Sequence, residues 1–108
     1  MEKLSHEEYL AFILIYAAYA DLEMNRDEAE RILDCIDREV FVETHRYFLK
    51  LNDKQRLDVV LAQKSQYLGT KESVEITLDE IKNLFKCDHK MLPIEQFYYN
   101  FLKKQLLS

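Results

Sequence analysis

The sequence predicts an all-α protein, a compact bundle of about six helices in one domain that spans residues 1–108. The chain has one glycine and one proline, whereas an all-β chain of this length needs many tight turns rich in these residues. Hydrophobic residues make up 48% of the chain, which is enough for a core and too many for a disordered segment. Apolar residues also recur at helical spacing along most of the sequence.

The first expected helix begins at Ser5, because Ser5 and Glu8 have the spacing of a capping box. It continues to about Ala20 through residues 9–20, all of which are apolar. A membrane-spanning helix needs about 20 apolar residues, and this run has twelve with acidic residues close on both sides. We therefore expect no membrane span but a helix buried at the centre of the bundle. Its most buried residues are expected to be Phe12, Ile13, Tyr16, Ala17 and Ala20.

A second helix is expected to begin at Asn25, which has Glu28 three residues later. Its buried stripe has the spacing i, i+3, i+4, i+7 and consists of Ala29, Ile32, Leu33 and Ile36. On the opposite face, the spacing predicts ion pairs from Asp27 to Arg31 and from Asp34 to Arg38, worth about 0.3 kcal/mol each.

The middle of the chain predicts three more helices. The first runs over about 38–51 and ends before Asn52, and the next contains Leu57, Val60, Leu61 and Leu68 and ends at Gly69. Residues 70–76 are polar and are expected to be a connection or a frayed helix start. The helix that follows ends near Lys86.

The last expected helix begins at Pro93, since proline suits the first helical position. Its stripe is the most regular in the chain and consists of Ile94, Phe97, Tyr98, Phe101, Leu102 and Leu106. Tyr99 lies off this stripe and could mark a contact surface.

Charge narrows the classes of partner. The net charge is −5, which argues against nucleic acid as a partner. The excess of negative charge is concentrated in residues 21–43, which contain nine acidic residues and only three arginines. Such a run is usually a solvated face, and its functional alternative is a docking surface for a basic protein partner. The sequence does not decide between a monomer and a homodimer.

The cysteines and histidines show no catalytic or metal-binding motif. Cys35 and Cys87 are far apart and no signal peptide precedes them, so we expect reduced thiols in the cytoplasm, buried as small apolar residues. His45 is expected to be partly buried with its hydrogen bonds satisfied, while His6 and His89 are expected to face solvent. No nucleophile motif is present, so we expect no enzymatic activity.

Two junctions between expected helices share one pattern. Asp21 is followed by Met24 and Glu28 at the spacing with which Asp88 is followed by Met91 and Glu95. In each junction, the Asp follows an apolar helix and the Glu falls near the third position of the next helix, where it caps free N–H groups and favours the helix dipole.

The same residues could also hold a divalent cation, because hard cations prefer oxygen ligands and each junction brings two carboxylates to one corner. The candidate metal ligands are Asp21, Glu28, Asp88 and Glu95. An EF-hand is excluded, because a loop starting at Asp21 has Arg26 where glycine is needed and Ile32 where the bidentate Glu is needed.

The segments IYAAYADLEMNRDEAERIL and LFKCDHKMLPIEQFYYNFL resemble the two helix corners of the tellurite-resistance TerB-like family. The resemblance covers about half the chain well and implies an all-helical cytoplasmic domain built from two related helical halves. It also implies a link to stress and tellurite resistance, and divalent-cation binding by the four acidic residues named above. The family has glycine after each Asp, whereas this chain has Leu22 and His89. A leucine costs about 1 kcal/mol or more at a positive φ, so the departure weighs against a tight cation site.

Two functions follow as expectations. The first is a non-enzymatic TerB-like interaction domain, related to stress or tellurite resistance, that acts through its acidic surface. The alternative is a regulatory module that binds a divalent cation with the carboxylates of the two corners.

Overall fold

The computed structural model describes residues 4–19, 24–86 and 93–107. These residues form seven helical segments and no strand: α1 (His6–Ala18), α2 (Arg26–Cys35), α3 (Arg38–Leu49), α4 (Asp53–Ala62), α5 (Lys64–Tyr67), α6 (Lys71–Phe85) and α7 (Pro93–Leu107). Because α5 is a single turn of four residues, six helices are longer than one turn. The prediction of an all-α bundle of about six helices is confirmed.

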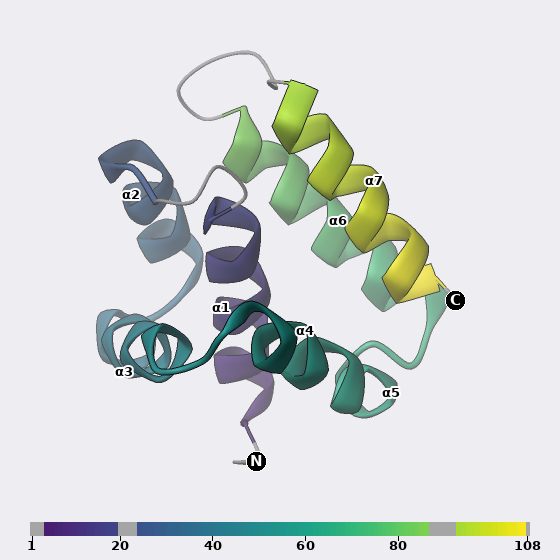
Figure 1. The fold of residues 1–108 in the computed structure, drawn as a ribbon, viewed down its shortest axis with the longest axis horizontal. Coiled ribbons are helices and arrows are strands. Elements are labelled where there is room, and N and C mark those ends of the chain that lie inside the picture. Colours follow the sequence, from purple (N-terminus) through teal and green to yellow (C-terminus); the bar gives the residue numbers. More distant parts are fainter. Residues whose placement is uncertain (1–3, 20–23, 87–92, 108) are drawn as a thin grey trace.

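Helix α1 lies at the centre of the bundle and contacts α2, α3, α4, α6 and α7 (Figure 1). Eight of its 13 residues are buried, as expected for a helix that is apolar on almost every side. Phe12, Ile13 and Ala17 are completely buried, which confirms three of the expected positions. Tyr16 is only half-buried, which corrects the expectation, because it lines a pocket described below. Ala20 lies outside the described residues.

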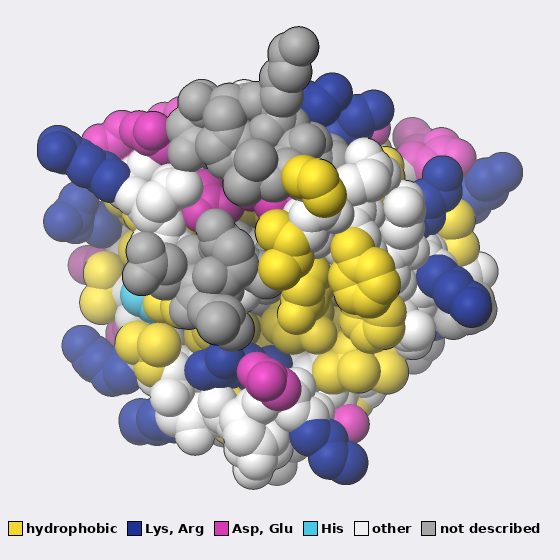
Figure 2. Space-filling model, turned by 45° about the horizontal axis from the view of Figure 1, so that its top comes forward, with side chains coloured by type: hydrophobic (Ala, Val, Ile, Leu, Met, Phe, Trp, Pro, Cys, Tyr) yellow, Lys and Arg dark blue, Asp and Glu magenta, His cyan; other side chains and the backbone are white. Residues whose placement is uncertain are grey.

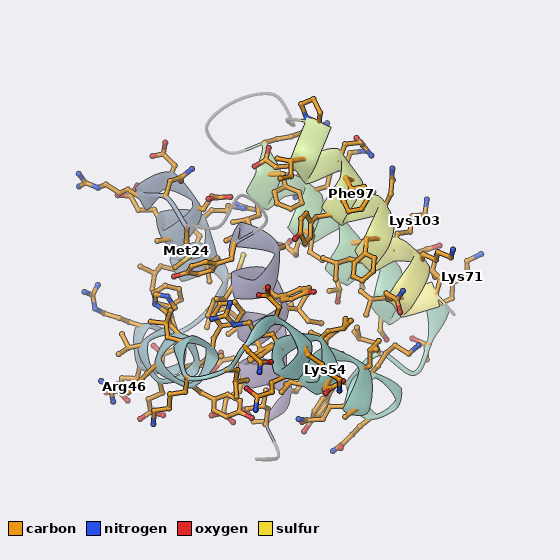
Figure 3. The ribbon with its side chains drawn as sticks, in the orientation of Figure 1. Met24, Arg46, Lys54, Lys71, Phe97 and Lys103 are labelled. Carbon is orange, nitrogen blue, oxygen red and sulfur yellow. The ribbon has the colours of Figure 1, made fainter. Side chains whose placement is uncertain are left out.

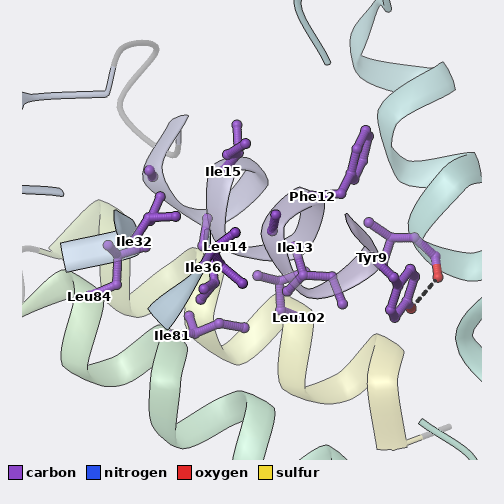
Figure 4. Packing of buried hydrophobic residues seen from close by; sticks show 14 of the residues in the cluster. Tyr9, Phe12, Ile13, Leu14, Ile15, Ile32, Ile36, Ile81, Leu84 and Leu102 are labelled. Carbon is purple, nitrogen blue, oxygen red and sulfur yellow. Dashed lines mark hydrogen bonds between the residues drawn. The ribbon is translucent and has the colours of Figure 1, made fainter. Parts of the chain in front are cut away.

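The core joins α1 to the helices on both sides of it. Figure 4 shows residues of α1 packed against Ile32 of α2, Ile81 of α6 and Leu102 of α7, all of which are completely buried. The Tyr9 hydroxyl, also in the core, donates a hydrogen bond to the carbonyl of Val60, 2.7 Å away. Burial raises the pKa of Tyr9 far above its ordinary value, so this phenol stays protonated and remains a donor.

The expected helix starts are confirmed by their caps. Ser5 and Glu8 form a reciprocal capping box at α1, and Asn25 and Glu28 form another at α2. Pro93 is the first residue of α7. Each start depends on side chains within one turn of the helix end, which is why the sequence reveals it.

The structure corrects two boundaries in the middle of the chain. Residues 71–76 are the first turns of α6, which Thr70 caps by accepting a hydrogen bond from the backbone N–H of Ser73. The single helix expected up to Gly69 is two helices, α4 and α5, separated at Gln63. Near this break, the Tyr9 hydroxyl donates a hydrogen bond to the carbonyl of Val60. In an unbroken helix, the same carbonyl would accept from the Lys64 N–H.

Only part of the apolar stripe of α7 is buried in the core. Leu102 and Leu106 are buried, whereas Tyr98 and Phe101 are half-buried. Ile94 and Phe97 at the beginning of the helix are 45% and 66% exposed. Figure 2 shows the hydrophobic side chains of this region as a continuous area, and Phe97 is labelled on α7 in Figure 3.

No helix in the described part of the chain is long and apolar enough to cross a membrane. The apolar residues 9–18 instead belong to α1, where eight of these ten residues are buried.

Candidate functional site

Two of the four predicted metal ligands can be placed. Glu28 and Glu95 are each the third residue of their helices, α2 and α7, as the repeated pattern predicts. Each is only 2% exposed, although glutamate is among the residues least often buried. Asp21 and Asp88 lie outside the described residues, as do Leu22, Cys87, His89 and Met91.

The contacts of Glu28 explain part of its burial. Its backbone N–H donates to the Asn25 side-chain oxygen at 2.8 Å, and its Oε1 accepts from the Asn25 backbone N–H at 3.1 Å. These two bonds satisfy groups that a helix start leaves free. Met24, just before this cap, is partly buried and packs against the core (Figure 3).

The two helix pairs that include the glutamate-bearing helices contact each other in the bundle. The pair α1 and α2 contacts the pair α6 and α7, through α1 with α6, α1 with α7 and α2 with α6. In Figure 1, the end of α1, the start of α2, the end of α6 and the start of α7 all lie in the upper half of the view. Among residues that the structure describes, no three His, Cys, Asp or Glu side chains lie close enough to hold a metal ion.

The acidic residues after the first corner lie mostly at the surface. We use the name acidic surface for the exposed members, which are Asp27, Glu30, Asp34, Asp37, Glu39 and Glu43. On α2, three of them are spaced i, i+3, i+7 and so share one face of the helix, while Ile32 is buried on another. Among the described residues, Glu30 alone of the six makes an ion pair.

Both ion pairs predicted for the second helix are wrong. Arg38 is the first residue of α3, and Asp34 makes no ion pair with a described residue. Arg31 does not pair with Asp27 but reaches α6, where its Nη2 lies 3.5 Å from Oε2 of Glu80. Arg26 pairs instead with Glu30 at 3.2 Å. Because Arg31 pairs with Glu80, Asp27 lacks the ion pair that the spacing predicts.

Cys35 corrects another expectation, because it is exposed rather than buried. Its Sγ donates a hydrogen bond to the same Glu80 Oε2 at 3.1 Å. Desolvation and the adjacent Glu80 carboxylate raise the thiol pKa, which disfavours the nucleophilic thiolate.

His45 has the partly buried, satisfied environment that the sequence predicts. Its Nε2 lies 2.8 Å from the Tyr19 hydroxyl, and its ring packs near Phe41 and Tyr19. Burial lowers the pKa of His45, so the neutral ring is favoured. His6 is exposed as expected and stacks on Tyr67.

One pocket, between four helical regions, is absent from the sequence-based predictions. It is lined by Tyr16, Tyr19, Phe48, Asp53, Arg56 and Tyr98 and has a volume of about 150 Å³. The one available signal is that Tyr16 and Tyr19 carry polar hydroxyls within the apolar run 9–20. A tyrosine in such a run buries its ring and needs a polar place for its hydroxyl.

Comparisons of the chain with protein-family models, with curated proteins and with solved structures found no match. The resemblance to the TerB-like family therefore stands on the two helix corners alone, of which Met24, Glu28 and Glu95 can be placed.

Proposed function

We propose that the chain is a non-enzymatic, TerB-like interaction domain that binds a basic protein partner through the acidic surface. The observation that carries this proposal is the line of exposed carboxylates on α2 and the start of α3. Asp27, Asp34 and Asp37 are exposed and make no ion pair with any described residue. Carboxylates left without local partners raise the potential that attracts and orients a basic protein.

Two described side chains of nucleophilic or basic chemistry, Cys35 and His45, support a non-enzymatic role. Cys35 is held as a thiol by Glu80, and His45 is engaged by Tyr19. The setting implied by the TerB-like resemblance is a cytoplasmic response to stress or tellurite, and we include it in the proposal.

The proposal is tested by neutralising part of the acidic surface. We expect the triple variant Asp27→Asn, Asp34→Asn, Asp37→Asn to bind a lysine-rich peptide about 10-fold more weakly at low salt, since each exposed ion pair is worth about 0.2–1 kcal/mol. Fluorescence anisotropy of the labelled peptide measures the affinity. Asp37 makes no side-chain capping bond, so its change leaves the α3 start intact.

A matched control removes the same charge elsewhere. The variant Glu72→Gln, Glu75→Gln, Asp79→Asn neutralises three exposed acids of α6 and should leave binding close to that of the wild type. Equal losses in both triple variants would show that net charge alone governs binding and would contradict the proposed surface.

The burial of Glu28 and Glu95 at the same helical position favours a second candidate function, the binding of a divalent cation at the two corners. Titration calorimetry with Ca²⁺, Mg²⁺, Mn²⁺ and Zn²⁺ separates this candidate from the first. If the chain is a cation-binding module, the titration gives saturable heat. Glu28→Gln and Glu95→Gln should then each lower the affinity for the cation by about 10-fold or more. The interaction domain predicts no such heat.

The glutamine variants isolate the charge of each glutamate. A glutamine at position 28 keeps an oxygen that can accept from the Asn25 N–H, so the capping box survives while the anionic ligand is lost. Asp27→Asn is the control, because Asp27 is adjacent in the sequence but exposed. Saturable heat that is unchanged in both glutamine variants would place any cation elsewhere.

A further inference from the structure

The pocket lined by Tyr16, Tyr19, Phe48, Asp53, Arg56 and Tyr98 has a chemistry different from that of the acidic surface. Tyr16 belongs to α1, Phe48 to α3, Arg56 to α4 and Tyr98 to α7, so four helices position its walls. None of these residues is a candidate metal ligand or a member of the acidic surface. A recess built from several rigid helices, with aromatic walls and a few polar groups, is typical of a small-molecule site.

The cation of the pocket is Arg56, and its orientation is fixed. Its Nε donates to the Phe48 carbonyl at 3.1 Å, and its guanidinium carbon lies 3.9 Å from the centre of the Phe48 ring. The side chain is 18% exposed. The terminal nitrogens make no hydrogen bond to any described residue. A guanidinium held in this way can present its fork to a carboxylate with little loss of side-chain entropy.

The contact between Arg56 and Asp53 shows that the guanidinium of Arg56 can pair with a carboxylate. Nη1 of Arg56 lies 3.6 Å from Oδ1 of Asp53, and the Asp53 side chain is fully exposed. An exposed ion pair of this length contributes little to stability. A ligand carboxylate can therefore replace Asp53 at the guanidinium while Asp53 turns into solvent.

Two phenol groups add hydrogen-bond donors beside the guanidinium. Burial raises the pKa of Tyr16, and the nearby Tyr98 and Asp53 raise it further, so the Tyr16 hydroxyl keeps its proton at neutral pH. The hydroxyls of Tyr16 and Tyr98 make no hydrogen bond to a described residue, whereas Tyr19 is engaged by His45. The pocket thus combines one guanidinium and two hydroxyl donors with the aromatic rings of its walls.

We propose that this pocket binds a small organic carboxylate whose oxygens meet Arg56 and the hydroxyls of Tyr16 and Tyr98. The body of the ligand lies against the aromatic walls. The volume of about 150 Å³ limits the ligand to a small molecule or to the acidic end of a larger one. The proposal is independent of the acidic surface and of the cation candidate, because it shares no residue with either.

The test is an NMR titration of the intact chain with sodium benzoate, with sodium chloride at the same ionic strength as the blank. We expect saturable shifts of the ring signals of Tyr16, Phe48 and Tyr98. Sodium phosphate and a short glutamate-containing peptide form two further arms. A stronger response to phosphate than to benzoate would overturn the carboxylate assignment. If the peptide saturates the pocket and benzoate does not, the proposal that the ligand is a free small molecule is overturned.

Matched variants identify the groups that bind. Tyr98→Phe should weaken benzoate binding about 10-fold, since a hydrogen bond to a charged group is lost, whereas Tyr99→Phe on the same helix should not change it. Asp53→Asn should strengthen binding about 2-fold or more, because the competing carboxylate loses its charge. This side chain is fully exposed, so the change leaves the fold intact. The absence of saturable shifts, or equal affinities in Tyr98→Phe and Tyr99→Phe, would overturn the proposal.

Discussion

Replacing Ile13 with alanine is expected to lower the free energy of unfolding by about 2–5 kcal/mol. Ile13 is completely buried in α1, the helix at the centre of the bundle. The truncation removes apolar contacts and leaves a cavity that a close-packed centre cannot close fully. Because the total stability of such a domain is only about 5–15 kcal/mol, the variant should unfold at much lower denaturant concentration. Urea denaturation followed by far-ultraviolet circular dichroism measures the change.

Ile76 provides the matched control for this prediction. It belongs to α6 and is 58% exposed, so Ile76→Ala should change stability by no more than about 0.5 kcal/mol. A loss below about 1 kcal/mol for Ile13→Ala would contradict the central position of α1.

Replacing Phe48 with alanine is expected to cost about 3–5 kcal/mol. The Phe48 ring is completely buried, with its centre 5.5 Å from that of Phe12 and 5.0 Å from that of Tyr19. It also lies under the guanidinium of Arg56. The variant therefore loses core packing, two aromatic contacts and a cation–π contact together. Thermal and denaturant unfolding should both show the loss.

Phe97→Ala removes the same side chain from an exposed position and is the control. Phe97 is 66% exposed on α7, so its truncation should change stability by about 0.5 kcal/mol at most. Similar losses for the two phenylalanine variants would mean that α3 is not packed on α1 as described.

The parts of the fold that the sequence predicts well are those decided by neighbouring residues. The starts at Ser5, Asn25 and Pro93 depend on side chains within one helical turn. The burial of α1 follows from an apolar run too short for a membrane and apolar on almost all sides. The position of Glu28 and Glu95 as third residues of their helices is predicted from the sequence, whereas their burial is not, because it depends on how α2 and α7 pack in the bundle.

The failed predictions involve partners that are distant along the chain. Arg31 and Cys35 both turn to Glu80 of α6, and no pattern within α2 indicates this. The break between α4 and α5 coincides with the bond from Tyr9, which lies 51 positions before Val60. The pocket around Arg56 is assembled from four helical regions, so it becomes apparent only when the helices are packed.

The proposed interaction surface is tested most directly by mapping where a basic ligand binds on the unmodified chain. A lysine-rich peptide titrated at low ionic strength into isotopically labelled protein should shift the backbone amide signals of α2 and the start of α3. The largest shifts are expected around Asp27, Asp34 and Asp37, and added salt should reverse them because exposed charges are screened. Shifts centred on the exposed part of α7 around Phe97, or no saturable shifts at all, would contradict an interaction domain that acts through its acidic surface.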